Sequence, residues 1–461
     1  MTTRRSFLGA GGAIVAGFRG LKAANLADSC PNPQAGYGSL VREPLGILEL
    51  PRGFRYDMFS NTGSLMDDGF FVPGNHDSMG AYPGPGGTTI LVRNHEMGSG
   101  AVNAGPYLRD RGLYDNLDVN LVYDRGRGIS PALGGTTTVI YDTKNHRLVR
   151  ESLSLTGTMR NCSGGVTPWG TWVSCEENVQ RSTGNFERDH GYNFEVPVST
   201  RMEVCVPVPL IAMGRFNHEA IAVHAQSGIV YETEDRGDGL LYRFIPNRPG
   251  GLREGGRLQA LAIRDRRSFD TRNYTARVLP VGTVLDVTWV DIEQVEAPND
   301  DLRAQGFAKG AARFTRGEGM WDTPESIFFA ATDGGPARAG QIFRYVPSPF
   351  EGQRGEERFP GRLELFIEPN DPAVYDMGDN ITVAPWGDIF VCEDGGGGDA
   401  VVGVTPEGKV YPFLRNIAND SEFTGGVFSP DGSTFFVNIQ TPGVTIAVWG
   451  PWRRNECDPL P

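Results

Sequence analysis

Lysine, histidine and cysteine are scarce in this sequence. Among 461 residues there are 6 His, 6 Cys and only four Lys. So few cysteines in a chain of this length do not make a disulfide framework. The net charge of −13 argues against a nucleic-acid partner, because phosphate backbones require a basic surface. No stretch approaches the roughly 18 apolar residues of a membrane-spanning helix, so no transmembrane segment is expected in the mature chain.

Turn-forming residues are abundant and exclude long helices. The 62 Gly and 32 Pro make up about a fifth of the chain, against an average of roughly 12%. Hydrophobic residues at 39% and aromatic residues at 10% are still enough to build a large core. This composition therefore argues against coiled coils, helical solenoids and helix bundles. An all-β fold with frequent turns is expected.

The N-terminus has the pattern of a twin-arginine export signal. Arg4 and Arg5 precede a Gly/Ala-rich apolar run of about 13 residues, too short to span a bilayer. Residues 1–29 are predicted to be the signal and leader, and residues 30–461 one folded domain. The expected partner is the twin-arginine machinery, which carries folded proteins, and the expected location is periplasmic or extracellular. Cys30 and Cys457 could pair after export, whereas Cys175 and Cys392 lie in apolar strand patterns and are expected in the core.

An internal repeat predicts the fold. Residues 164–177 and 381–394 both read as a strand, a Pro-x-Gly turn, a second strand and an acidic pair. The pattern recurs at 220–235 and 425–440, and in weaker copies at 87–94 and 324–333. One hairpin with outer strands is the content of a propeller blade. We therefore predict a single-domain, six-bladed β-propeller with irregular loop insertions, one of them near 265–315; a double β-sandwich is the structural alternative.

Polar residues occupy two repeated positions of these hairpins. In a propeller the innermost strands surround a channel, so residues at one register converge on its axis. The ends of the second strands hold Glu176, Glu234, Glu393 and Asn438, and the starts of the first strands hold Asn161, Cys162, Glu219, Glu318, Asp379, Asn380 and Glu422. Two charges 4 Å apart repel by about 4 kcal/mol at an effective dielectric of about 20, so these acids need protons or cations. The alternative is that these acids are ordinary solvent-exposed residues at the ends of strands and bind nothing.

Donor chemistry and a nearby arginine indicate the kind of site. Carboxylate oxygens suit Ca²⁺, and a thiolate from Cys162 among them suits iron or zinc, unless Cys162 is a plain buried thiol. His95 and His218 alternate with the following acid on their strands and are expected to pack structurally. Arg316 is expected on the same strand face as Glu318. Cations and a guanidinium side by side would suit the binding of a phosphate ester. The alternative is that Arg316 has only a structural role.

These residues together resemble the PhoX-type alkaline phosphatases. The matching motifs are at 94–96, 161–172, 175–178, 214–219, 316–320, 379–380, 393–395 and 421–425. The resemblance implies an exported, monomeric, six-bladed propeller that hydrolyses small phosphate monoesters with an iron–calcium cluster. It implies Cys162 as an iron ligand and further metal ligands at Glu96, Glu176, Glu219, Glu318, Asp379, Glu393 and Glu422. Arg316, Glu318 and Cys162 would form the catalytic set.

Two other functions are compatible with the same pattern. One is a different calcium-dependent propeller enzyme, phytase-like or lactonase-like. The other is a non-catalytic secreted propeller that keeps calcium for stability. The chain is shorter than typical members of the resembled family, which leaves its substrate range open.

Overall fold

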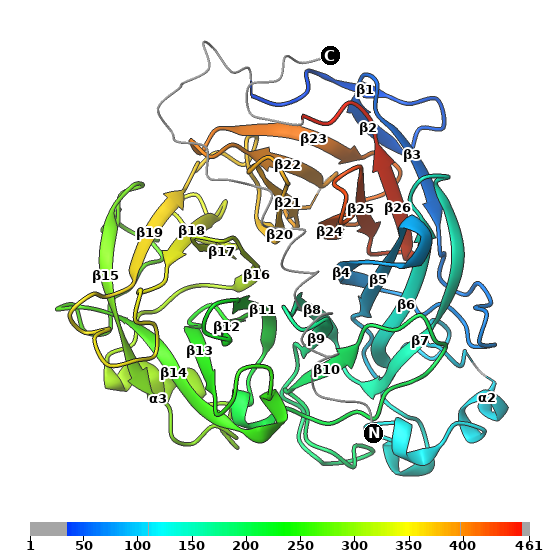
Figure 1. The fold of residues 1–461 in the computed structure, drawn as a ribbon, viewed down its shortest axis with the longest axis horizontal. Coiled ribbons are helices and arrows are strands. Elements are labelled where there is room, and N and C mark those ends of the chain that lie inside the picture. Colours follow the sequence, from blue (N-terminus) through cyan, green and yellow to red (C-terminus); the bar gives the residue numbers. More distant parts are fainter. Residues whose placement is uncertain (1–34, 109, 397, 454–461) are drawn as a thin grey trace, which may run out of the picture.

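The strands of this protein are arranged around a common centre, as in a propeller (Figure 1). The computed structural model describes residues 35–108, 110–396 and 398–453. The predicted export signal, Cys30 and Cys457 lie outside the described residues. Within them, no helix has both the length and the apolar character needed to cross a membrane. The predicted all-β, propeller-like arrangement is confirmed.

The described strands form five hydrogen-bonded sheets. The first contains β4 (His76–Pro83), β5 (Thr88–His95), β6 (Gly134–Asp142) and β7 (Arg147–Thr158). The second contains β8 (Asn161–Val166), β9 (Thr171–Glu176) and β10 (Asn193–Pro197). The third has the order β11 (His218–His224), β12 (Ile229–Glu234), β13 (Leu241–Pro246), β14 (Gly256–Ile263), β15 (Val284–Asp291), β19 (Arg362–Ile367), β18 (Gln341–Val346), β17 (Ile327–Ala331) and β16 (Gly317–Asp322).

The last two sheets combine strands from both ends of the chain. The fourth has the order β20 (Gly378–Val383), β21 (Ile389–Glu393), β22 (Ala400–Val404), β23 (Val410–Asn416), β2 (Leu48–Pro51) and β1 (Leu40–Arg42). The fifth contains β24 (Phe423–Phe428), β25 (Thr434–Ile439), β26 (Val444–Trp449) and β3 (Arg55–Phe59). The helices are short: α2 (Arg111–Asp115), α3 (Leu302–Lys309) and single 3₁₀ turns at Pro85–Gly87, Val119–Leu121, Gly126–Gly128, Ile211–Met213 and Leu252–Glu254.

Five sheets, rather than six separate ones, is a difference from the predicted architecture. It arises in the segment predicted as an insertion near 265–315, which contains β15 and α3. Strand β15 pairs with β14 on one side and with β19 on the other, so two groups of strands join into one nine-stranded sheet. The sequence repeat does not cover β15, and its pairing was not predicted.

Six strands line the centre of the ring. Strands β4, β8, β11, β16, β20 and β24 each contact the next, and β24 contacts β4, which closes the circle (Figure 1). The hairpin turns predicted after these strands form as expected; Gly170 and Gly387 have φ of 83° and 104°, which glycine adopts without strain. Both faces of the adjoining strands are buried, as the burial of every residue of β21 and β25 illustrates.

Close approach between inner strands requires a residue without a side chain at Gly165. A Cβ added there would lie 2.1 Å from the carbonyl oxygen of Ile221 in the neighbouring inner strand. We expect Gly165→Ala to lower the free energy of unfolding by about 2 kcal/mol or more, because the two strands must move apart. Urea unfolding measures this. Gly100→Ala, where an added Cβ meets nothing within 4 Å, is the control; equal stability of the two variants would contradict the packing described here.

Candidate metal centre

One backbone hydrogen bond recurs at all six inner strands. The residue just before each inner strand accepts, through its carbonyl oxygen, from the N–H of the residue just after the second strand of that hairpin. The N···O distances are 2.9 to 3.2 Å. The six acceptor–donor pairs are Asn75–Glu96, Arg160–Glu177, Asn217–Asp235, Arg316–Thr332, Met377–Asp394 and Glu422–Gln440. Each hairpin therefore brings its first and last residues together at one rim of the ring.

A register shift follows at the start of every inner strand. In each case three steps on the inner strand face two on its partner, which is the arrangement of a β-bulge. Bulges re-aim side chains and are common beside active sites. In five of these strands the second residue lies within the shift, and the five are Asp77, Cys162, Glu219, Glu318 and Asp379. In β24 the second residue, Thr424, still pairs with Asn438, and the shift begins after it. All five residues within the shift carry a group able to bind a metal.

These positions assemble into a continuous set of donor groups. Four triads have ligand atoms within 4.8 Å of one another, and consecutive triads share one residue. They are Asp77, Glu96 and Cys162; Cys162, Glu177 and Glu219; Glu219, Glu318 and Asp379; and Asp379, Asp394 and Glu422. Six residues singled out from the sequence are among them: Glu96, Cys162, Glu219, Glu318, Asp379 and Glu422.

The structure does not bring Glu176 and Glu393 into these triads. Glu176 is buried behind the rim, where it accepts from the N–H groups of Met159 and Gly191 at 2.9 and 2.8 Å. Glu393 likewise accepts from the N–H of Asp376 at 2.9 Å. The next residues, Glu177 and Asp394, occupy the triads instead. Successive strand residues point to opposite faces, so an error of one residue sends the carboxylate into the protein rather than toward the axis.

Three donors were missed by sequence reasoning, and each had a signal. Glu177 and Asp394 are second members of the acidic pairs that close the repeated hairpins, a pattern that was noted without choosing the right member. Asp77 ends the sequence Asn-His-Asp, which parallels Asn-His-Glu at 217–219. The histidines themselves pack as predicted: His95 and His218 are buried, with ring nitrogens 3.0 Å from the carbonyl oxygens of Gly74 and Gly214.

Two arginines stand among the donors. Arg316 places Nη2 3.0 Å from Glu318 and Nε 3.2 Å from Asp235. Arg160, which sequence reasoning did not single out, places Nη2 2.5 Å from Glu96 and also pairs with Glu177. Both immediately precede an inner strand and have positive φ, 38° and 48°, a strained conformation held by the surrounding structure. Their side chains are 29% and 43% exposed, so each guanidinium is accessible from the rim.

Burial and mutual repulsion raise the pKa values of the donors. Burial, followed by Asp379 and Glu177, raises the pKa of Glu219 well above its ordinary value. Burial, followed by neighbouring carboxylates, raises the pKa of Asp379 to about 8 and that of Glu422 to about 11. Burial also raises the pKa of the Cys162 thiol. A bound cation would reverse each of these shifts, because it favours the ionised form.

The surroundings of Glu219 give the strongest evidence that the donor set can bind cations. It is fully buried, and neither carboxylate oxygen has a hydrogen-bond partner among the described residues. A buried carboxylate without a partner costs several kcal/mol, whereas other buried acids in the chain, such as Glu176, are satisfied by N–H groups. Glu219 also belongs to two of the four triads. The residues present therefore fit metal ions.

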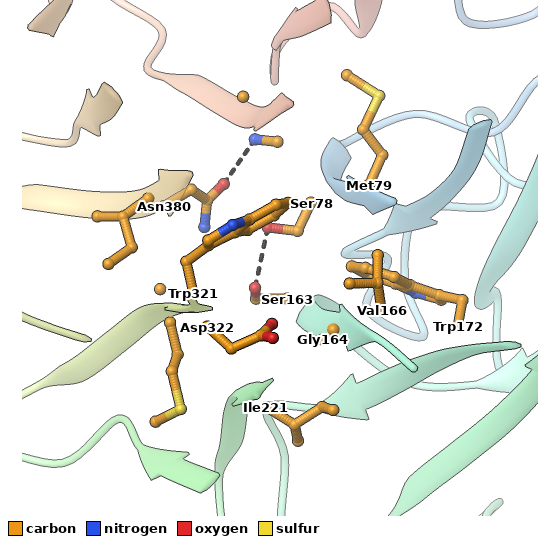
Figure 2. A pocket seen from close by; sticks show the side chains of 16 residues that line it. Ser78, Met79, Ser163, Gly164, Val166, Trp172, Ile221, Trp321, Asp322 and Asn380 are labelled. Carbon is orange, nitrogen blue, oxygen red and sulfur yellow. Dashed lines mark hydrogen bonds between the residues drawn. The ribbon is translucent and has the colours of Figure 1, made fainter. Parts of the chain in front are cut away.

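A cavity lies among the inner strands beside the donors (Figure 2). Its lining includes Ser78, Ser163 and Asn380, which directly follow Asp77, Cys162 and Asp379 in the inner strands. Further lining comes from apolar side chains such as Ile221. The indole of Trp321 extends into it (Figure 2). The donor set thus adjoins a cavity lined largely by glycine, serine and apolar side chains.

The fold and this acidic, thiol-containing centre define a propeller-like protein with the donor chemistry of a metalloenzyme. The family model of alkaline phosphatase PhoX matches residues 35–443, so the chain belongs to that family. The likeness stated from sequence motifs is thereby confirmed.

Comparisons beyond the family are weak. A sequence comparison with curated proteins finds no significant match. Among solved structures, a streptogramin B lyase has 10% identity and a TM-score of 0.39, over 87% of this chain and 98% of that one. A gluconolactonase from Xanthomonas campestris has 10% identity and a TM-score of 0.37, over 86% and 100%. Similarities at this level carry no argument about function.

Removing the Glu219 charge is expected to change the pH dependence of stability in the metal-free protein. The raised pKa of Glu219 means that its ionisation destabilises the fold as pH rises above about 4.3, the value for an unfolded chain. Metal-free Glu219→Gln should therefore be more stable than metal-free wild type at pH 8, and the difference should shrink toward pH 4.5. Urea unfolding at several pH values after chelation measures it. Glu293→Gln, at an exposed site, is the control; parallel curves for wild type and Glu219→Gln would contradict the expectation.

Proposed function

We propose that this chain is a metal-dependent phosphomonoesterase that releases phosphate from small phosphate esters in the periplasm or outside the cell. The observation that carries the proposal is the run of shared donor triads, with Glu219 unpaired at its centre and Arg316 held beside it. Membership in a family described as alkaline phosphatase supports the reaction class. Export by the twin-arginine route rests on Arg4 and Arg5 and the apolar run after them.

We count six blades in the ring. The nine-stranded sheet is then two blades, β11–β15 and β16–β19, joined by the pairing of β15 with β19. The recurrence of the same hydrogen bond and the same register shift at six inner strands supports this division.

The donor set supports a mixed centre. We assign the two triads that contain Cys162 to iron, because a thiolate among carboxylates suits a transition metal, and the two all-carboxylate triads to calcium. In this proposal Glu177 and Asp394 replace Glu176 and Glu393 as ligands, and Asp77 joins them. Bound cations would polarise phosphoryl oxygens and offset their negative charge.

Arg316 is the proposed phosphate contact. Asp235 and Glu318 engage its Nε and Nη2, which fixes the plane of the guanidinium and leaves Nη1 for a phosphate oxygen. Arg160 is a second candidate, because Glu96 and Glu177 both engage its Nη2 and it is the more exposed of the two. Two fixed guanidinium groups at one rim would orient the ester before its P–O bond breaks. They would also stabilise the negative charge that develops on the phosphate oxygens.

Arg316→Ala is expected to lower kcat/KM for an aryl phosphate by about 100-fold or more, as the loss of a fixed donor to a developing charge does elsewhere. Metal content must be measured on the same sample, because Arg316 also contacts Glu318. Arg344→Ala is the matched control, since Arg344 pairs with Glu364 on an outer strand. Unchanged kcat/KM in a fully metallated Arg316→Ala protein would remove Arg316 from the proposed reaction.

Cys162→Ser is expected to abolish binding of the transition metal while most calcium is retained. Elemental analysis of protein exported by its own signal measures both, and Cys205→Ser, at a partly exposed thiol in no triad, is the control. Calcium without any transition metal in the wild type would favour a calcium-dependent propeller instead. No hydrolysis of aryl phosphates by fully metallated wild type would favour a binding protein.

A further inference from the structure

Asn94 lies fully buried between two sheets and contacts the backbone beside Cys162. It belongs to β5 in the first sheet, two residues before Glu96. Its Nδ2 donates across the junction to the carbonyl oxygens of Cys162 and Ser163, at 3.2 and 2.5 Å. These two carbonyls lie in the register shift of β8, where the ordinary ladder of β8 with β9 is interrupted. Asn94 therefore supplies hydrogen bonds at the point where the sheet does not.

The direction of the Asn94 amide is determined by its other partners. Its Oδ1 accepts from Trp172 Nε1 and from Ser174 Oγ, each at 2.9 Å. An indole N–H can only donate, so Oδ1 must face Trp172 and the NH₂ group must face the two carbonyls. Both N–H groups and both lone pairs of the amide are then used. Asn94 thus ties β8 and β9 of one sheet to β5 of the next at fixed distances.

We propose that Asn94 is a positioning residue for the Cys162 thiol. Cys162 belongs to two triads, one with Asp77 and Glu96 and one with Glu177 and Glu219, so its sulfur must reach both at once. Asn94 fixes the peptide units on the C-terminal side of Cys162, and through β5 it fixes them relative to Glu96. It is not itself in a triad. This role of Asn94 rests on the proposed metal centre where metal binding is measured, but the position of the thiol can also be tested without metal.

The same register carries a comparable contact at two other junctions. Thr233 and Asn438 also lie two residues before the end-of-hairpin position, and they donate to the carbonyl oxygens of Glu318 and Asp77 at 2.7 and 2.8 Å. At the remaining three junctions the register holds Cys175, Ala330 and Cys392. The contact is thus directed at carbonyls of donor residues, and the one made by Asn94 serves Cys162.

The test compares Asn94→Leu, which keeps the size of the side chain but not its hydrogen bonds, with Thr332→Val as a control. Thr332 is buried, and its Oγ1 donates to the carbonyl oxygen of Gly378 in another inner strand at 2.8 Å. In metal-loaded protein, Asn94→Leu should hold the transition metal about 10- to 100-fold more weakly, the range seen when groups that orient ligands are removed. The thiolate-to-metal absorption should shift or vanish. Thr332→Val should leave that absorption unchanged, because Asp379, the residue after Gly378, shares no triad with Cys162.

A second readout needs neither metal nor activity. In metal-free protein, the rate of Cys162 alkylation by iodoacetamide, read by peptide mass, should rise at least 10-fold in Asn94→Leu and stay at the wild-type rate in Thr332→Val. If Asn94→Leu does not fold, Ser174→Ala, which removes one of the two donors to Asn94 Oδ1, should shift both readouts in the same direction. Wild-type alkylation rates in the folded variants would overturn the inference. Absence of a transition metal in wild type, with altered alkylation in Asn94→Leu, would instead overturn the metal assignment.

Discussion

The rest of the site depends on a single backbone contact made six times. In every inner hairpin the carbonyl before the first strand accepts from the N–H after the second, so the two ends of the hairpin meet at the same height on the ring. In five of the six inner strands the register shift that follows includes the second residue of the strand and turns it toward its equivalents in the other hairpins. Because backbone groups make these contacts, the side chains at the same positions are free to vary. Those positions hold arginine, carboxylates and a thiol.

The cost of this arrangement is concentrated negative charge. The carboxylates are too close and too buried for water to screen them, and Arg160 and Arg316 engage only part of the set. Burial and like charge raise the pKa values of Glu219 and Glu422, and they raise the pKa of Glu318 well above its ordinary value even though Glu318 contacts Arg316. Such a site is stable when its acids are protonated or when cations are bound among them.

Much of this could be predicted from sequence, since the hairpin repeat is explicit in the order of residues. The repeat predicted the propeller-like ring, the strand starts that carry Cys162, Glu219, Glu318 and Asp379, and the role of Gly170 in a turn. It did not predict which of two adjacent acids faces the axis, because Glu176 and Glu177 differ by one step in a strand and no composition rule distinguishes them. The β15–β19 pairing lies outside the repeat and depends on contacts between segments far apart in the chain.

The pairing of chain ends has a consequence for how the protein matures. Strand β3, made early, has β26 as its partner, and β2 pairs with β23. Strand β3 is synthesised long before β26, so β3 stays unpaired until almost the whole polypeptide has emerged from the ribosome. Asp77 and Glu422 lie on the two sides of that last seam, but no triad spans it: Asp77 shares a triad with Glu96 and Cys162, and Glu422 shares one with Asp379 and Asp394. Closure of the seam therefore completes the ring rather than any single triad. Because the last triad includes Glu422, the complete donor set exists only once nearly the whole chain has been made.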